Sequence, residues 1–203
     1  MQKDLYVCFI DYEKAFDRIK HGEMVRMLES IGVDGKDIRL IKNLYWNQKA
    51  SFKIEEEFSD WVEVKRGVRQ GCVMSPDLFS LYGEFIMRET EVVCGVRVGG
   101  QNVNNIRYAD DTVLIADSED GLRHLLQVVK DASEEKGLSI NVAKTECLVI
   151  SKEQRQPRCS LEVDGCRVKQ VDKFCYLGSW ITSNGRCEKE IEHRIGEAKG
   201  ALL

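Results

Sequence analysis

Three aspartates are the residues of this sequence best suited to chemistry. Asp11 follows an uninterrupted apolar run over 5–10, which predicts a strand that is buried on both faces. Asp110 and Asp111 stand between two further apolar segments. Carboxylates that meet from remote strand ends can hold two divalent cations about 3.5–4 Å apart, and such a pair suits phosphoryl transfer. The sequence therefore predicts a two-metal site at Asp11 and Asp110.

The Asp110-Asp111 pair also has a plainer interpretation. Asp-Asp is a common turn dipeptide, and a turn between two strands needs no catalytic purpose. Adjacent acids in a strand point to opposite faces, whereas a tight turn can direct both toward one point. The catalytic hypothesis therefore depends on whether the strand that ends at Asp11 lies beside this pair.

The elements around these acids predict an α+β fold. Strands are expected over 5–10, in a hairpin within 50–64, around a turn within 95–116, over 138–150, at an Asp-Gly hairpin over 163–166, and over 174–181. Helices are expected over 24–31, over 37–46, from Ser75 as N-cap to about 86, from a cap at Ser118 to Gly137, and over 188–203. We expect the helices to cover one face of a mainly antiparallel sheet.

Composition narrows the class of protein without naming a function. The chain has 203 residues, 43% hydrophobic and 32% charged, which is enough to bury a core. Its net charge of −4 argues against a dedicated nucleic-acid-binding domain, although a cation site must itself concentrate carboxylates. The apolar runs are too short for a membrane span, so we expect no membrane partner. No basic import cluster is visible, and the sequence leaves nucleus or cytoplasm open.

The eight cysteines allow two interpretations. No Cys-x-x-Cys pair occurs, and the first interpretation is eight buried or partly buried free thiols in a reducing compartment. The second is a zinc site, although its spacings match no tight structural-zinc pattern. Its candidate ligands are Cys159, Cys166, Cys175, Cys187 and His193.

Five segments resemble the polymerase motifs A to E of reverse transcriptases, in the form used by LINE-type (non-LTR) retrotransposons. They occur in the family's order and cover about residues 5–182. The segments are Phe9 to Asp17 (motif A), Arg69 to Pro76 (motif B), the Tyr-Ala-Asp-Asp box over 108–111 (motif C), Gly137 to Thr145 (motif D) and Phe174 to Ser179 (motif E). The resemblance implies a polymerase palm that performs RNA-directed DNA synthesis from dNTPs, on an RNA template and a DNA primer, with two Mg²⁺ ions.

The resemblance also implies roles around the metal ions. Asp11 and Asp110 would be the principal metal ligands, and Asp111 would assist as a third carboxylate. The backbone carbonyl of Tyr12 would complete one metal's shell. Lys144 would be the general acid for the pyrophosphate leaving group, although a lone lysine after a strand is usually a solvated charge.

The nucleotide pocket is implied by motifs A and B. Phe16 matches the steric gate, whose ring leaves no room for a ribose 2′-OH, and Lys14 and Ala15 precede it in the same nucleotide-binding segment. Gln70 and Gly71 match the loop that lies against the incoming nucleotide, where glycine permits close backbone approach. The alternatives are a core aromatic at Phe16 and an ordinary turn before a capped helix.

Motif E and the ends of the chain complete the predictions. Tyr176, Leu177 and Gly178 match the primer grip, with a hydrophobic strand as the alternative. We expect residues 1–182 to form the palm with partial fingers, and 183–203 to begin a truncated thumb or connecting helix. Most of the fingers, the thumb and an endonuclease segment are expected to be missing. A catalytically incompetent, element-derived remnant that acts at most as a binding module is therefore the alternative to an active polymerase.

Overall fold

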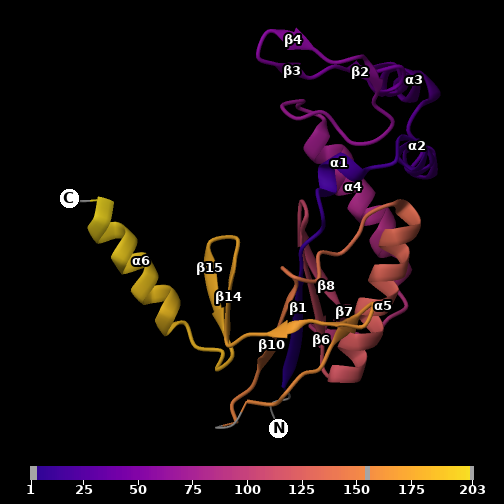
Figure 1. Ribbon diagram of the computed structural model, residues 1–203. Helices are drawn as coiled ribbons and strands as arrows, with labels where there is room; N and C mark the ends of the chain where they lie inside the picture. The colour runs from indigo at the N-terminus through magenta and orange to yellow at the C-terminus, as the bar shows by residue number, and fades with distance from the viewer. Residues whose placement is uncertain (1–3, 154–155, 202–203) are drawn as a thin grey trace.

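A computed structural model describes residues 4–153 and 156–201 (Figure 1). The helices are α1 (Ala15–Arg18), α2 (His21–Ser30), α3 (Gly35–Tyr45), α4 (Ser75–Met87), α5 (Glu119–Lys136) and α6 (Glu188–Ala201), with a 3-10 turn η1 (Arg88–Thr90). The strands are β1 (Leu5–Ile10), β2 (Lys49–Ala50), β3 (Lys53–Ile54), β4 (Glu57–Phe58), β5 (Val62–Glu63), β6 (Val96–Val98), β7 (Gln101–Val103), β8 (Asn105–Tyr108), β9 (Asp111–Ala116), β10 (Glu146–Ile150), β11 (Glu162–Val163), β12 (Cys166–Arg167), β13 (Lys169–Gln170), β14 (Lys173–Tyr176) and β15 (Ser179–Thr182).

A five-stranded sheet in the order β13-β10-β1-β9-β8 organises the molecule. β1 lies at its centre and pairs antiparallel with β10 and with β9, while β13 joins the edge of β10 in parallel. The last four residues of β1 are at most 4% exposed, as the unbroken apolar run predicts for a strand buried on both faces. The mainly antiparallel α+β architecture is therefore confirmed.

The two faces of the sheet are covered differently. α5 packs on β1 and β9, and α4 packs against α5, so the helices share one face. On the other face lies the β14–β15 hairpin, where the ring of Phe174 stacks on Phe9 at a centroid distance of 3.7 Å. Alternation along β1 explains this division, because Cys8 and Ile10 enter the core under the helices while Val7 and Phe9 enter the core under the hairpin.

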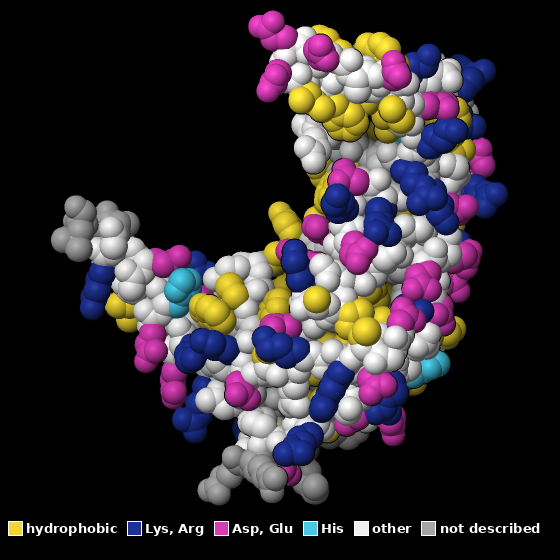
Figure 2. All heavy atoms as spheres, in the orientation of Figure 1, with side chains coloured by type: hydrophobic (Ala, Val, Ile, Leu, Met, Phe, Trp, Pro, Cys, Tyr) yellow, Lys and Arg dark blue, Asp and Glu magenta, His cyan; other side chains and the backbone are white. Residues whose placement is uncertain are grey.

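A second lobe stands above the sheet in Figure 1 and contains α1, α2, α3 and the β2–β5 strands. Its strands form two hairpin ladders, β2 with β5 and β3 with β4. Figure 2 shows the molecule hollowed between this lobe and the side that carries β14, β15 and α6. Several apolar side chains of the lobe are about 70% exposed, namely Phe52, Ile54, Phe58 and Trp61.

Three local predictions are wrong. Ser75 is the first residue of α4 rather than its cap, because Met74 is the N-cap and the Ser75 hydroxyl donates to the carbonyl of Arg69. Only 146–150 of the expected strand over 138–150 is extended. The segment 174–181 is a hairpin rather than one strand, with a turn at Leu177 and Gly178, where φ is +48° and +78°. In each case hydrogen bonds to another segment, near or remote in the sequence, decide the conformation.

Other local predictions are confirmed. The Ser118 side chain accepts from the amide of Gly121 at the start of α5, and Gly137 ends that helix in a left-handed conformation with φ of +93°. The 163–166 segment is the expected hairpin. No helix in the described ranges has the length and apolar character needed to cross a bilayer.

All eight cysteines are free. The expectation that all are at least partly buried is wrong, because Cys94, Cys166, Cys175 and Cys187 are exposed. Among the residues that the structure describes, no group of three Cys, His, Asp or Glu side chains is arranged to hold a metal ion. The zinc interpretation therefore finds no support in the fold.

Candidate active site

The three aspartates meet at one end of the central sheet. Ile10 of β1 pairs with Thr112 of β9, so the same antiparallel register, continued by one residue, places Asp11 opposite Asp111. Tyr108 pairs with Asp111, which leaves Ala109 and Asp110 as the turn between β8 and β9. Strand pairing thus brings together acids that are remote in the sequence.

The β8–β9 turn has a strained backbone. Ala109 takes a φ of +53°, the left-handed region, which costs a residue with a Cβ about 1–2 kcal/mol. This conformation allows a tight reversal directly before Asp110. Strain of this kind persists only where the surroundings enforce it, and it is common at functional sites.

A cleft of about 730 Å³ opens beside this end of the sheet. Eight predicted site residues line it, namely Asp11, Tyr12, Lys14, Ala15, Phe16, Gln70, Asp110 and Lys144. Four further lining residues were not predicted as site residues: Glu13, Asp17, Arg18 and Asn141. Arg18 and Asn141 could have been found, because both lie within or next to the segments that resemble motifs A and D.

Asp111 faces the β14–β15 hairpin instead of lining the cleft. The hydroxyl of Tyr176 donates to the backbone carbonyl of Asp111 at 3.3 Å. Partial burial, followed by the charges of Asp110 and Asp11, raises the pKa of the Asp111 carboxyl. The contribution of both other acids agrees with the strand register, which brings the three carboxyls to one end of the sheet.

The segment 139–145 holds the end of β1 in place. The amide of Asp11 donates to Thr145 Oγ1 at 3.3 Å, and its carbonyl accepts from the amide of Asn141 at 2.8 Å. The Thr145 hydroxyl donates in turn to the carbonyl of Asn141 at 2.9 Å. The same turn carries Lys144, whose amide also donates to Asn141. These bonds set Asp11 and Lys144 on the walls of one cleft.

The side chain and the backbone of Tyr12 lie in different surroundings. Its ring is buried and its hydroxyl shares a hydrogen bond with Ser133 of α5 at 3.1 Å. Its backbone lies opposite Ile140 in an antiparallel bridge. The hydrogen bonds of this bridge are made by the backbone groups of the flanking residues, not by those of Tyr12. The carbonyl of Tyr12 therefore makes no hydrogen bond in that bridge and points away from it, toward the side of the β8–β9 turn.

Phe16 is half-buried at the cleft wall and stacks on Phe79 of α4, with a centroid distance of 4.4 Å. The segment that leads into motif B runs alongside, since the amide of Val68 donates to the carbonyl of Phe16 at 2.9 Å. Gly67 is required here, because a Cβ would lie 3.0 Å from the Asp17 backbone and φ is +90°. This close pairing carries the chain to Gln70 in the cleft, and Gly71 follows outside the cleft lining with φ of +77°.

The predicted primer-grip residues form the tip of the β14–β15 hairpin. Tyr176 is half-buried near Phe9, whereas Leu177 is 51% exposed in the turn beside Gly178. A left-handed φ at an exposed leucine is unusual, because a bare turn would favour glycine or asparagine. None of these three residues lines the cleft; they lie on the Asp111 side of the acids.

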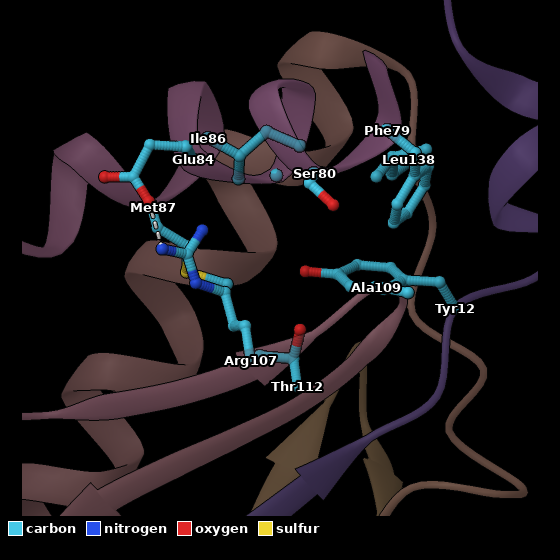
Figure 3. A pocket seen from close by; sticks show the side chains of 11 residues that line it. Tyr12, Phe79, Ser80, Glu84, Ile86, Met87, Arg107, Ala109, Thr112 and Leu138 are labelled. Atoms are coloured by element: carbon cyan, nitrogen blue, oxygen red, sulfur yellow. Dashed lines mark hydrogen bonds and ion pairs between the residues drawn. The ribbon is translucent and has the colours of Figure 1, made fainter. Parts of the chain in front are cut away.

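A smaller cavity of about 190 Å³ lies behind the β8–β9 turn, between α4 and the sheet (Figure 3). The hydroxyls of Tyr12 and Ser80 point toward it, and Arg107 forms an ion pair with Glu84 at its rim. Ala109 also lines it. The turn that carries Asp110 is thus backed by a cavity rather than by a fully packed core.

The carboxylates are suited to a divalent cation, within limits that the geometry sets. Their side chains do not form a three-ligand cage, because no such group occurs in the described part of the chain. Mg²⁺ is usually held by one or two carboxylates together with water and substrate phosphates. Asp11 and Asp110, which line one open cleft, fit that pattern.

Comparison with known proteins assigns the family. The profile of "Reverse transcriptase (RNA-dependent DNA polymerase)" matches residues 1–181, and the chain therefore belongs to the reverse transcriptase family. Enzymes of this family are nucleotidyltransferases that generally use divalent metal ions.

Curated relatives point to the non-LTR branch. The chain is 29% identical over 96% of its length to the "Retrovirus-related Pol polyprotein from type-2 retrotransposable element R2DM" of Drosophila melanogaster. It is 26% identical over 93% of its length to the "Retrovirus-related Pol polyprotein from type-1 retrotransposable element R2" of Nasonia vitripennis. It spans 19% of each polyprotein. The predicted origin in a non-LTR retrotransposon is thereby confirmed.

A solved structure agrees on the fold. Telomerase from Candida tropicalis, in complex with a fragment of telomeric RNA, superposes with a TM-score of 0.66 at 14% identity. The match covers 93% of this chain and 30% of the telomerase chain. The polymerase palm fold predicted from the motifs is confirmed.

Proposed function

We propose that this chain carries the catalytic palm of an RNA-directed DNA polymerase, which adds a nucleotide from a dNTP to a primer 3′-OH on an RNA template. The observation that supports it most is the meeting of Asp11, Asp110 and Asp111 at one sheet end, next to a cleft lined by motif A, B and D residues. The telomerase relative of known structure is bound to RNA, which supports a nucleic acid partner. The whole activity belongs to a protein about five times longer in the R2 relatives, of which this chain corresponds to 19%.

Two Mg²⁺ ions are proposed at the acids, where they would activate the primer hydroxyl and neutralise the pyrophosphate. Asp11 and Asp110 would hold them, and the carbonyl of Tyr12 would contribute a further oxygen. Asp111 assists from the hairpin side. Partial burial, followed by the charges of Asp110 and Asp11, raises its pKa, and a nearby cation would stabilise its ionised form against both effects.

The remaining cleft residues bind the nucleotide. Phe16 is braced by its stacking on Phe79, so its ring can act as a fixed barrier below the sugar and exclude a ribose 2′-OH. Lys14, Ala15 and Gln70 on the cleft wall bind the nucleotide, and Gly71, which follows outside the lining, shapes the loop that carries Gln70. Lys144 gives a proton to the departing pyrophosphate, and its place on the cleft wall supports this role.

The β14–β15 hairpin is the proposed primer grip. Tyr176 anchors it beside Asp111, while the exposed Leu177 and Gly178 at its tip contact the primer end. We propose that 1–182 form the palm with part of the fingers, and that 183–203 begin the thumb or a connecting helix. The RNA template, the DNA primer and the further segments of the element protein are the proposed partners.

Primer extension on an RNA template, with dNTPs and Mg²⁺, tests the proposal. The chain is compared with Asp110→Asn and with Asp131→Asn, a matched charge removal on the solvent side of α5. We expect extension to fall at least about 100-fold in Asp110→Asn and to persist in Asp131→Asn. Persistence in Asp110→Asn would refute the ligand assignment.

Binding of Mn²⁺ separates activity from site integrity. Thermal stabilisation by Mn²⁺ in the wild-type chain, lost in Asp110→Asn, is expected whether or not the chain extends a primer. Stabilisation without extension would favour the incompetent remnant, and absence of both would contradict the metal site itself.

A further inference from the structure

The lobe hairpin (residues 49–63, with β2 to β5) leaves much apolar surface uncovered. Every residue from 52 to 63 is exposed. An apolar patch gathered on one element marks an interaction surface, and a two-stranded hairpin by itself is only marginally stable in water. A partner that covers this hairpin would therefore stabilise it. Five of its exposed residues are large and apolar and between 58% and 71% exposed, namely Phe52, Ile54, Phe58, Trp61 and Val62.

The lobe hairpin also holds the acidic excess of the chain. Residues 52–63 have five acidic side chains and one lysine, a net charge of −4 that equals the net charge of the whole chain. Glu63 pairs with Lys65 at the base of the hairpin at 3.2 Å. Within the described ranges, no ion pair is formed by the other four acids, which are Glu55, Glu56, Glu57 and Asp60. A partner therefore has to offer positive charge.

The two kinds of side chain are both accessible on this lobe. Figure 2 shows acidic side chains at the outer end of the lobe and hydrophobic ones along its side toward the hollow. A partner that lies along the hairpin would meet both kinds. It therefore needs apolar side chains as well as basic ones.

The backbone of the lobe hairpin is open to a further strand. Among the described residues, β3 and β4 pair only with each other, with Lys53 opposite Phe58 and Ile54 opposite Glu57. Successive side chains of a strand point to opposite faces, so β4 presents the acid Glu57 on one face and the ring of Phe58 on the other. An unpaired edge is a template for strand addition. A strand added along β4 would match it if basic and apolar side chains alternate.

Two other occupants fit the lobe hairpin less well. A second copy in a two-fold dimer would bring the same unpaired acids against themselves, and like charges that face each other are destabilising. RNA would meet the same repulsion through its phosphates, because surfaces that bind nucleic acid are basic. A basic polypeptide is the occupant that matches the charge, the apolar surface and the strand edge together.

We propose that the lobe hairpin is a docking site for a partner protein, which adds a basic strand along the outer edge of β4. Lysine or arginine side chains of that strand pair with Glu57 and the acids beside it. The alternate, apolar side chains of the strand pack on Phe58. The proposal does not depend on whether the chain extends a primer, because the hairpin contributes no residue to the cleft.

Peptide binding to the whole chain tests the site. The probe is a fluorescein-labelled peptide of alternating lysine and valine, followed by anisotropy at pH 7 and low salt. We expect it to bind at least about tenfold more tightly than a lysine–serine peptide of equal charge or a glutamate–valine peptide of equal length. Equal binding of the lysine–serine peptide would show attraction by charge alone and would overturn the proposal.

Charge variants locate the binding on the lobe hairpin. Removing three of its acids should lower the affinity for the lysine–valine peptide at least about fivefold, in the variant Glu55→Gln, Glu56→Gln, Glu57→Gln. The matched control removes three exposed acids that lie elsewhere and should change the affinity less than about twofold, in the variant Glu89→Gln, Glu162→Gln, Glu192→Gln. Equal losses in the two variants would mean unspecific attraction to an acidic chain and would contradict the site.

Phe58→Ser tests the apolar half of the interaction. Its matched control is Ile195→Ser, which removes an apolar side chain that is 49% exposed on α6. Circular dichroism verifies that both variants are folded. We expect the affinity for the lysine–valine peptide to fall at least about fivefold in Phe58→Ser and to persist in Ile195→Ser. Unchanged affinity in folded Phe58→Ser would refute the proposal.

Hydrogen exchange and the other two occupants complete the test. The lysine–valine peptide should slow amide exchange over 52–60 at least about fivefold and leave α6 unchanged. Unchanged exchange over 52–60 would contradict strand addition. Affinity for single-stranded RNA that falls in Phe58→Ser would assign the hairpin to nucleic acid. Self-association of the chain that Phe58→Ser abolishes would assign it to a second copy, and either result would overturn the proposal.

Discussion

The substitution Thr145→Val should weaken the proposed metal site by removing a hydrogen bond that holds Asp11. Thr145 is fully buried, and its Oγ1 accepts from the amide of Asp11 and donates to the carbonyl of Asn141. Valine has nearly the same shape as threonine but can neither accept nor donate a hydrogen bond. The carbonyl of Asn141 stays satisfied, because it also accepts from the amides of Lys144 and Thr145. The amide of Asp11 is therefore the group that loses its partner.

The size of the effect follows from these contacts. An orphaned, partly buried amide costs about 1–3 kcal/mol, and the length of the lost bond, 3.3 Å, favours the lower end. The added methyl group of valine offsets part of this cost. We expect a loss of about 1 kcal/mol, which at a urea m-value of about 2 kcal/mol/M lowers the midpoint of unfolding by about 0.5 M.

The assay is urea unfolding followed by circular dichroism, with and without Mn²⁺, and Thr145→Ser is the matched control. Serine keeps the hydroxyl and loses a methyl group, so it also lowers stability by about 1 kcal/mol but leaves Asp11 held. We expect stabilisation by Mn²⁺ to shrink in Thr145→Val and to persist in Thr145→Ser. If both variants lose it equally, or if Thr145→Val unfolds at the wild-type midpoint, the reasoning about Asp11 is refuted.

Three further predictions concern neighbouring features. The pKa of Asp111 is raised in the folded chain, so its carboxyl stabilises the fold when protonated and costs stability as pH rises from 3.8 through that pKa. Asp111→Asn should therefore be more stable than wild type at pH 7 without metal, by less than about 1 kcal/mol for so exposed a group. A stability difference between the two proteins that persists at pH 3 in urea unfolding would contradict this. Gly67→Ala should cost about 2–4 kcal/mol of stability in the same assay, because the new Cβ would meet the Asp17 backbone. Gly32 also has a positive φ, but a Cβ there would meet no other atom, so Gly32→Ala should cost only about 1 kcal/mol. Equal costs would disprove the steric argument. Leu177→Asn should raise the melting temperature slightly, since asparagine tolerates a φ of +48°, yet weaken primer binding in a gel-shift titration; unchanged primer affinity would remove Leu177 from the primer grip.

Much of the candidate site could be predicted from residue order. The motif segments placed Asp11, Phe16, Gln70 and Lys144 in one set, and all of them line the same cleft. Sequence reasoning missed Thr145 as a support for Asp11, because a hydrogen bond between a threonine side chain and a remote amide leaves no local pattern. It gave Asp111 only an assisting role beside Asp110, but it did not predict that Asp110 lines the cleft while Asp111 lies beside the β14–β15 hairpin.

The sequence by itself determined the conformation of the segments that carry strong local signals. An unbroken apolar run has to be buried on both faces, so 5–10 could only be a central strand, and a serine cap and a terminal glycine set the ends of α5. Tertiary structure alone decided which strands are neighbours and that 174–181 folds back into a hairpin on the face of Phe9. These outcomes depend on pairing and burial between segments far apart in the chain, where the free energy comes from contacts that no single segment contains.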